Sequence, residues 1–240
     1  MKAVVPHGPT LWLRRLGRAL LDVLYPPLCL GCEDRLPADA RALPLCTACL
    51  RAMPRAEPGI LAPRLARFPG GSEAFDQAAA LWVFDAEGAL QRLQHALKYG
   101  NRPTLGVRLG RLVGEAWSDE SPRPNVIVPV PLHRRRWLER GYNQSERLAA
   151  GIGEILDRPV RADLLTRPRA TRSQTALSQP ERWKNVADAF ALTDPDVVAG
   201  RHVLLVDDVL TTGATAVAAA APLRAAGATV SLAVLACTRE

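Results

Sequence analysis

The residues with the clearest capacity for chemistry lie near the C-terminus, where two adjacent carboxylates follow an apolar run. Val203 to Val206 is continuously apolar, which is typical of a strand buried on both faces of a parallel sheet. Asp207 and Asp208 come directly after it, at the expected end of that strand. An alanine-rich helical segment lies further on, and the loop before it has small and hydroxyl-bearing residues: Thr211, Thr212, Gly213, Ala214 and Thr215.

This order of strand, carboxylates, loop and helix suits a phosphorylated sugar. Backbone N–H groups of a small-residue loop that opens onto a helix N-terminus bind phosphate, and threonine hydroxyls add donors. Adjacent carboxylates repel phosphate, but they accept hydrogen bonds from sugar hydroxyls and bind hard cations such as Mg²⁺. The pattern therefore predicts a ligand with a phosphate at one end and a ribose diol beside it. The alternative is a buried strand, a solvated acidic turn and an ordinary helix N-terminus.

Four cysteines form two CxxC pairs in the N-terminal part of the chain. Cys29 and Cys32 make the first pair, and Cys46 and Cys49 make the second after thirteen intervening residues. Two such tight loops can turn four thiolates toward one tetrahedral ion, so the spacing predicts a structural four-cysteine zinc ribbon with Zn²⁺. A pair of disulfides or redox-active thiols is the alternative, which a reducing compartment disfavours.

Length and composition indicate one good hydrophobic core with an appendage. The chain has 240 residues, of which 48% are hydrophobic. A stretch rich in proline and glycine, from Met53 to Gly71, marks a boundary between a domain at 1–60, with an N-terminal helix and the zinc ribbon, and a domain at 70–240. Strands are expected at 78–84, 126–130, 203–206 and 229–236, and helices at 86–98 and 103–117.

Charge and hydropathy limit where the chain works and what it binds. No apolar run approaches the roughly 18 residues needed to span a bilayer, so no stable membrane insertion is expected. Arginines interrupt the apolar positions of the first thirty residues, which argues against a signal peptide and for a cytoplasmic location. The net charge of +7 favours polyanionic partners, although genomic base composition is an alternative source of the arginines.

Two stretches carry a resemblance to a known family. VLLVDDVLTTGAT, residues 203–215, resembles the motif with which type I phosphoribosyltransferases bind phosphoribosyl pyrophosphate (PRPP). VPVPLHRRRWLERGYNQSERLA, residues 128–149, is similar to the signature of the ComF family (ComFC/GntX-like), in which a cysteine-rich segment precedes such a domain. The likeness runs from about Leu20 to Arg239. It implies an α/β fold of the type I phosphoribosyltransferase kind, with a mostly parallel sheet and flanking helices.

The resemblance also implies roles for individual residues. Asp207 and Asp208 are expected to hold the ribose hydroxyls, directly or through Mg²⁺, and the loop from Thr211 to Thr215 is expected to anchor the 5-phosphate. The residues expected on the pyrophosphate side are Lys98, Leu132, His133, Arg134 and Arg140. The residues expected in a mobile lid that excludes water are Arg172, Ser173 and Gln174. Each of these roles has an alternative. Lys98 could be a solvated lysine at a helix end, the arginines could form a solvated basic turn, and the segment with Arg172 could be a flexible connector.

Two functions from different classes follow from this resemblance. The first is a phosphoribosyltransferase, which displaces pyrophosphate from C1 of PRPP; no acceptor pocket is identifiable. The second is a non-catalytic component of the DNA-uptake machinery in natural competence, which binds single-stranded DNA along its arginines and zinc ribbon and has a competence helicase as a candidate partner. Trp137, which lies among the arginines, is the tryptophan expected to be exposed for base stacking.

Overall fold

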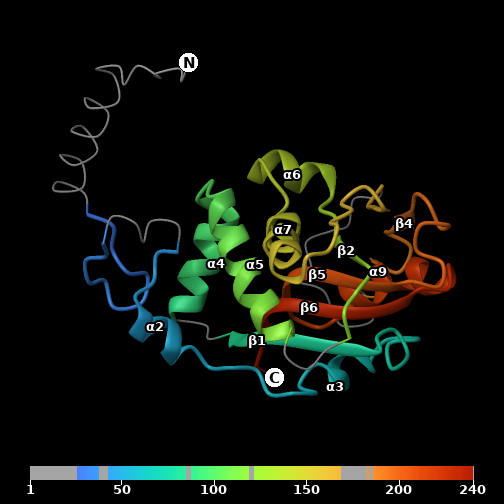
Figure 1. Cartoon of the computed structure of the whole chain (residues 1–240), viewed down its shortest axis with the longest axis horizontal. Helices are drawn as coiled ribbons and strands as arrows, with labels where there is room; N and C mark the ends of the chain where they lie inside the picture. The colour runs from blue at the N-terminus through green and yellow to red at the C-terminus, as the bar shows by residue number, and fades with distance from the viewer. Residues whose placement is uncertain are drawn as a thin grey trace, which may run out of the picture. The chain divides into compact units, whose positions relative to one another are not determined.

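In the computed structural model of the chain, which describes residues 26–37, 43–84, 88–118, 122–168, 183 and 186–239, the four stretches predicted as strands pair in one parallel sheet (Figure 1). Their order across the sheet is β1-β6-β5-β2, so β5 and β6 are central. The bounds are Gln77–Phe84 for β1, Val126–Pro129 for β2, His202–Leu210 for β5 and Thr229–Thr238 for β6. Both central strands are largely buried, as their continuous apolar runs predict.

Helices pack around the sheet. They are α3 (Ala62–Leu65), α4 (Ala89–Tyr99), α5 (Pro103–Ser118), α6 (Arg134–Arg140), α7 (Gln144–Leu156) and α9 (Ala214–Ala225). α5 packs on β1 and β6, α7 packs on β2 and β5, and α9 packs on β5 and β6. A separate two-stranded antiparallel sheet consists of β3 (Leu165–Thr166) and β4 (Ala191–Leu192). Within the described residues, no helix is long and apolar enough to cross a membrane.

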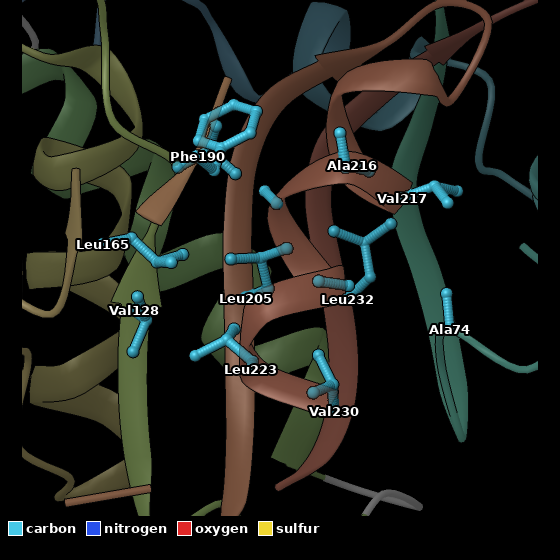
Figure 2. Close-up of a cluster of buried hydrophobic side chains, with 14 of the residues drawn as sticks. Ala74, Val128, Leu165, Phe190, Leu205, Ala216, Val217, Leu223, Val230 and Leu232 are labelled. Atoms are coloured by element: carbon cyan, nitrogen blue, oxygen red, sulfur yellow. The ribbon is translucent and has the colours of Figure 1, made fainter. Parts of the chain in front are cut away.

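The principal hydrophobic core lies between the sheet and α9. Leu205 of β5 and Leu232 of β6 lie with Val217 and Leu223 of α9 in one buried cluster (Figure 2). Alternate residues of a strand face opposite sides of a sheet, so Leu205 faces this cluster while its neighbour Leu204 is buried outside it. The core therefore fixes the end of β5 and the start of α9 relative to each other.

The second layer depends on a close approach of α5 to α7 through glycine. A Cβ atom on Gly110 of α5 would lie 2.1 Å from the backbone oxygen of Leu148, and one on Gly151 of α7 would lie 2.0 Å from the backbone oxygen of Val107. Real Cβ atoms do not approach backbone oxygens this closely, so only glycine permits the observed helix spacing. The backbones of α5 and α7 therefore lie in close contact at both glycines.

Gly110→Ala is expected to lower the free energy of unfolding by roughly 2 kcal/mol or more, because the helices must separate to admit the methyl group. Chemical denaturation checks this, with Arg108→Ala, at an exposed position of the same helix, as the matched control. Equal stability of the two variants would contradict the close-packing account.

The chain divides into two units, one ending at Ala52 and one beginning at Met53. Residues 53–60 therefore belong with the second unit, whereas the sequence placed them in the first domain. Hydrogen bonds give the reason: the Val83 N–H donates to the Pro54 oxygen (2.9 Å) and the Ala56 N–H donates to the Leu81 oxygen (3.3 Å). This proline-rich segment thus pairs with the exposed edge of β1 and does not act as a free connector.

Candidate functional site

A pocket of about 390 Å³ opens at the carboxyl ends of the four parallel strands. The terminal or following residue of each strand contributes to its wall: Phe84, Val130, Leu210 and Thr238. Open α/β sheets bind ligands at this end of their strands. Most of the polar residues singled out in the sequence converge here, from β5, the loop before α9, α4 and α6.

The carboxylate pair lies within β5 and not beyond its end. Pairing of β5 with β2 stops at Val206, but pairing with β6 continues to Leu210, so the strand extends past the acidic residues. The hydroxyl of Ser145 donates to Asp207 Oδ1 at 2.8 Å, and the Asp208 N–H donates to the same oxygen at 2.8 Å. These contacts fix the Asp207 carboxylate at the floor of the pocket.

Lys98 forms an ion pair with the second carboxylate. Its Nζ lies 3.1 Å from Asp208 Oδ2, while Asp208 Oδ1 accepts a hydrogen bond of 2.8 Å from the Val209 N–H. Oδ2 is buried and accepts no well-aligned hydrogen bond from the described residues, so its interaction with the ammonium group is that of an ion pair. This oxygen retains the capacity to take a further donor or a cation.

Burial shifts the ionisation of Asp207. Removal from water raises the pKa of Asp207 to about 7, and the neighbouring Asp208 charge acts in the same direction. The Ser145 hydroxyl, the Asp208 N–H and the Lys98 charge lower this pKa, but by less than burial raises it. A carboxyl group that changes charge near neutral pH therefore lies at the site where a sugar hydroxyl or a cation is expected.

The loop after β5 has the form of a phosphate cradle. Gly213 adopts φ +95°, in the left-handed region that favours glycine, and it is the N-cap of α9. Thr211, Thr212, Gly213 and Thr215 line the pocket, whereas Ala214 is buried in the first turn of α9. The predicted loop therefore meets the pocket at four of its five positions, with threonine hydroxyls and a helix N-terminus beside the carboxylates.

The basic run after β2 forms a helix, and the helix decides which arginines face the pocket. Arg136 and Arg140, four residues apart on α6, line the pocket together with Leu132. Arg135 points elsewhere, because its Nε pairs with Glu139 at 3.1 Å and its side chain is 84% exposed.

His133 and Arg134 do not line the pocket, although the sequence assigned them to it. His133 is the N-cap of α6, and its Nδ1 accepts a hydrogen bond from the Arg135 N–H at 3.2 Å. Arg134 begins α6 and is exposed. Charge alone does not show whether a run of basic residues is helical. The sequence therefore could not predict which of these side chains face the pocket.

Residues 141–145, part of the stretch that resembles the ComF signature, have a structural role. Gly141 ends α6 at φ +77°. The Tyr142 hydroxyl donates to the Leu97 oxygen, and Asn143 Nδ2 donates to the Val130 oxygen at 3.0 Å. Asn143 Oδ1 also caps α7 by accepting from the Ser145 N–H at 3.1 Å. The string therefore positions Ser145 against Asp207.

The four cysteines of the first unit form a second candidate site. Their Sγ atoms all lie within 4.8 Å of one another, and all four cysteines are free. The Sγ atoms of Cys32 and Cys46 are 3.8 Å apart, far from the roughly 2.05 Å of a disulfide and close to the roughly 3.8 Å edge of a tetrahedron with 2.3 Å metal–sulfur bonds. This cluster can hold a metal ion.

Backbone N–H groups donate to the thiols of the cluster and favour the thiolate form of Cys29. Those of Gly31 and Cys46 each donate to Cys29 Sγ at 3.3 Å, and that of Cys49 donates to Cys46 Sγ at 3.3 Å. Burial opposes ionisation of Cys29, but hydrogen bonds led by the Cys46 N–H lower its pKa to about 6. Helix α2 (Thr47–Ala52) and the antiparallel bridge between Leu28 and Arg35 accompany the two loops.

The chain has clear relatives. Residues 149–240, which include the carboxylates and the loop, match the family model described as phosphoribosyl transferase domain. The DNA utilization protein YhgH of Salmonella typhimurium is 33% identical over 207 residues, which cover 79% of this chain and 87% of that protein. Competence protein F of Haemophilus influenzae is 35% identical over 132 residues, 52% of this chain and 58% of that protein. The chain belongs to the ComF family.

The ComF-family chain spans about 60% of the length of the other YhgH relatives that it matches. Among solved structures it is similar to the glutamine PRPP amidotransferase from B. subtilis complexed with ADP and GMP, with 24% identity, a TM-score of 0.40, and coverage of 58% of this chain and 30% of that chain. The expected fold class is confirmed by the phosphoribosyltransferase family match and the parallel sheet with flanking helices.

Sequence reasoning missed three contributors to the site of this ComF-family chain. Gln94 and Arg167 line the pocket, and Ser145 holds Asp207. The spacing of four residues between Gln94 and Lys98 is a helical signal that could have found the first of them. The predicted lid residues Arg172, Ser173 and Gln174 lie outside the described residues, so the lid stays a prediction.

Proposed function

We propose that the chain binds PRPP together with Mg²⁺ in the pocket and transfers its phosphoribosyl group to an acceptor. The observation that carries this proposal is the juxtaposition of a partly buried carboxylate pair, in the last part of β5, with a glycine and threonine loop that opens onto α9. Few ligands need both features. The family match to a phosphoribosyl transferase domain supports the same assignment.

Each part of the pocket has a task in this proposal. Thr211, Thr212, Thr215 and the backbone N–H groups of the loop bind the 5-phosphate. Asp207 and Asp208 accept hydrogen bonds from the ribose hydroxyls, or hold Mg²⁺, which when bound neutralises charge on the diphosphate. Because Lys98 pairs with Asp208, it keeps that carboxylate oriented before the ligand arrives.

The proposed reaction exchanges one bond at C1 of the ribose for another. The C1–oxygen bond breaks and its electron pair leaves with pyrophosphate, while a lone pair of the acceptor forms the new bond and the acceptor then loses its proton. Positive charge develops on the ring as the bond breaks, and the carboxylates below it stabilise that charge. Arg136 and Arg140 stabilise the departing anion.

Calorimetric titration of PRPP with Mg²⁺ into the full chain tests the proposal. We expect micromolar binding, and Mg²⁺-dependent release of pyrophosphate once an acceptor is supplied. Folded protein that binds neither PRPP nor pyrophosphate would contradict it. Binding without transfer to any acceptor would instead identify a PRPP sensor.

Binding of Mg²⁺ and PRPP is expected to strengthen about tenfold between pH 6 and pH 8 if ionised Asp207 is required, because its pKa is near 7. Because the pKa of Asp207 is raised in the folded protein, its carboxyl group keeps a proton up to about pH 7. This proton must leave before the ligand binds, so affinity increases with pH. Asp207 correspondingly contributes less to stability as the pH rises toward 7.

The phosphates of PRPP also ionise in this range, so Ser145→Ala decides the origin of the pH dependence. Loss of the Ser145 hydroxyl removes a hydrogen bond that lowers the Asp207 pKa, so the midpoint of the affinity profile should move to higher pH. An identical profile in the variant would assign the pH dependence to the ligand.

A second candidate function is binding of single-stranded DNA along α6. Trp137 is 49% exposed and Leu138 is 66% exposed, beside the exposed side chains of Arg134 and Arg135. An exposed tryptophan among arginines suits a base stacked over a phosphate track. The names of the relatives, DNA utilization protein and competence protein, favour a role in DNA uptake. Trp137→Ala should weaken binding of an oligonucleotide and leave PRPP binding unchanged.

A further inference from the structure

Helix α3 contacts the loop before α9 from outside the pocket. A Cβ atom on Gly213 would lie 3.2 Å from Leu65 Cδ2 and 3.6 Å from the Arg64 backbone oxygen, so α3 packs closely behind this glycine. Gly213 lines the pocket, but no residue of α3 does. Helix α3 therefore supports the loop without being in a position to touch a ligand.

The hydrophobic core holds α3 in place. Leu61, Leu65 and Phe68 are all buried, and they belong to the same cluster as Ala214 and Val217 of α9. Buried apolar side chains keep an element in one position, because moving them would expose their surface to water or open a cavity. The support behind the loop is therefore in place before a ligand arrives.

Arg64 provides a second link between α3 and the pocket wall. Its side chain is only 3% exposed, and its Nη1 donates to Thr238 Oγ1 at 3.5 Å. Thr238 is the last residue of β6 and lines the pocket. Burial raises the pKa of the neighbouring Cys237, and the Arg64 charge opposes that rise, as expected for a guanidinium group close to the end of β6. An arginine is seldom buried this far unless specific partners hold it.

We propose that α3 is a brace for the phosphate-binding loop, and that Leu65 and Arg64 are its positioning residues. Leu65 packs behind Gly213, and Arg64 connects α3 to the end of β6, so both hold the pocket wall without touching the ligand. Backbone N–H groups bind phosphate most tightly when their directions are fixed beforehand, because a preordered loop loses less entropy on binding.

The brace rests on the proposed function for the identity of its ligand. It adds a role for the segment before β1, whose proline and glycine content marks a domain boundary in the sequence. This segment sets the affinity of the pocket for the phosphate end of the ligand, although it contributes no residue of α3 to the pocket lining.

Titration of ribose 5-phosphate into the full chain tests the brace at Leu65. Leu65→Ala shortens the side chain behind Gly213, so the loop gains freedom and the Kd should rise roughly tenfold, the effect of losing about one hydrogen bond to the phosphate. Leu109→Ala is the matched control, because Leu109 is fully buried in α5 and lies outside the cluster that contains α3. It also leaves a cavity but should change the Kd less than about threefold. An equal rise in the control would overturn the brace.

Two substitutions at Arg64 test the second link. Arg64→Met cannot donate to Thr238, so the Kd for ribose 5-phosphate should rise roughly threefold to tenfold. Arg64→Lys retains a donor and the charge, so it should recover most of the affinity although it lacks the planar fork. Arg67→Met, at an exposed arginine just after α3, should bind as the unchanged protein does. Equal losses in Arg64→Met and Arg64→Lys would overturn the role of the contact with Thr238.

Hydrogen exchange measures the coupling in the unchanged chain and needs no variant. Saturating ribose 5-phosphate should slow amide exchange at residues 62–68 as well as in the loop before α9. The reason is that a ligand that stabilises the loop also stabilises the helix packed against it. Slower exchange in the loop without any change at residues 62–68 would overturn the brace, even if the variants failed to fold.

The same measurements distinguish failure of the brace from failure of the proposed function. If the unchanged chain binds PRPP and ribose 5-phosphate, and folded Leu65→Ala and Arg64→Met bind them equally well, the brace is wrong while the sugar-phosphate site stands. If the folded unchanged chain binds neither ligand, the proposed function is wrong, and the brace is wrong with it.

Discussion

Asp208→Asn is expected to weaken binding of PRPP with Mg²⁺ by roughly a hundredfold or more. The substitution removes the negative charge that a cation or two ribose hydroxyls require, at a side chain only 15% exposed and therefore poorly screened by water. The amide also loses the ion pair with Lys98, so this contact no longer holds the side chain of residue 208 in its orientation. Isothermal titration of PRPP into the variant measures the loss.

The fold should survive this substitution. The amide side chain of the variant retains an oxygen that can accept from the Val209 N–H, as Asp208 Oδ1 does at 2.8 Å, so the strand keeps its local hydrogen bond. Asp163→Asn is the matched control, because Asp163 is an exposed carboxylate paired with Arg161 at 2.8 Å and does not line the pocket. Loss of binding in the control, or full binding in a folded Asp208→Asn protein, would contradict the assignment.

Strand positions were predictable because buried strands have continuous apolar runs. The predicted strands at 78–84, 126–130 and 229–236 correspond to β1, β2 and β6 within about three residues at each end. The end of β5 was not predictable, since carboxylates normally mark a strand's exit. Here β6 continues to pair with β5 through Asp207 and Val209, so tertiary hydrogen bonding extends the strand beyond its apolar part.

Residue roles were predictable where neighbours in sequence act together, and not where they meet by folding. The carboxylate pair and the loop before α9 lie within nine residues, so their common pocket follows from local order. Ser145 and Asp207 are 62 residues apart and meet only because α7 packs on β5 in the folded chain. Arg167 reaches the pocket because β3 pairs with β4. Strands of two residues are too short to show an apolar pattern, so this pairing was not predictable.

The cysteine cluster leads to the second large effect: the chain should contain about one zinc ion, and Cys46→Ser should lose it. The described part of the first unit has little else to hold it together. Its buried apolar side chains are few, namely Cys29, Leu36, Pro44 and Leu45, and α2 buries no residue. A segment this poor in core relies on cross-links or metal for its structure.

Removal of one thiolate leaves three ligands and opens the tetrahedron to water, so affinity for zinc falls and the two CxxC loops lose their common anchor. Metal analysis of protein purified without chelator measures the ion. Hydrogen exchange should become faster across residues 26–37 and 43–52. Cys237→Ser is the control, because Cys237 is buried in β6, outside the cluster, and should leave the zinc content unchanged.

The four-cysteine arrangement also limits the chemistry that a bound metal can perform. Four thiolates occupy every position of a tetrahedral ion, so zinc held by all four has no open position for substrate or water. The metal is therefore expected to maintain structure while the pocket at the strand ends does the chemistry. A chelator should then remove zinc and loosen the first unit, yet leave the Kd for PRPP within about threefold of its starting value. Parallel loss of both would show that the two sites depend on each other.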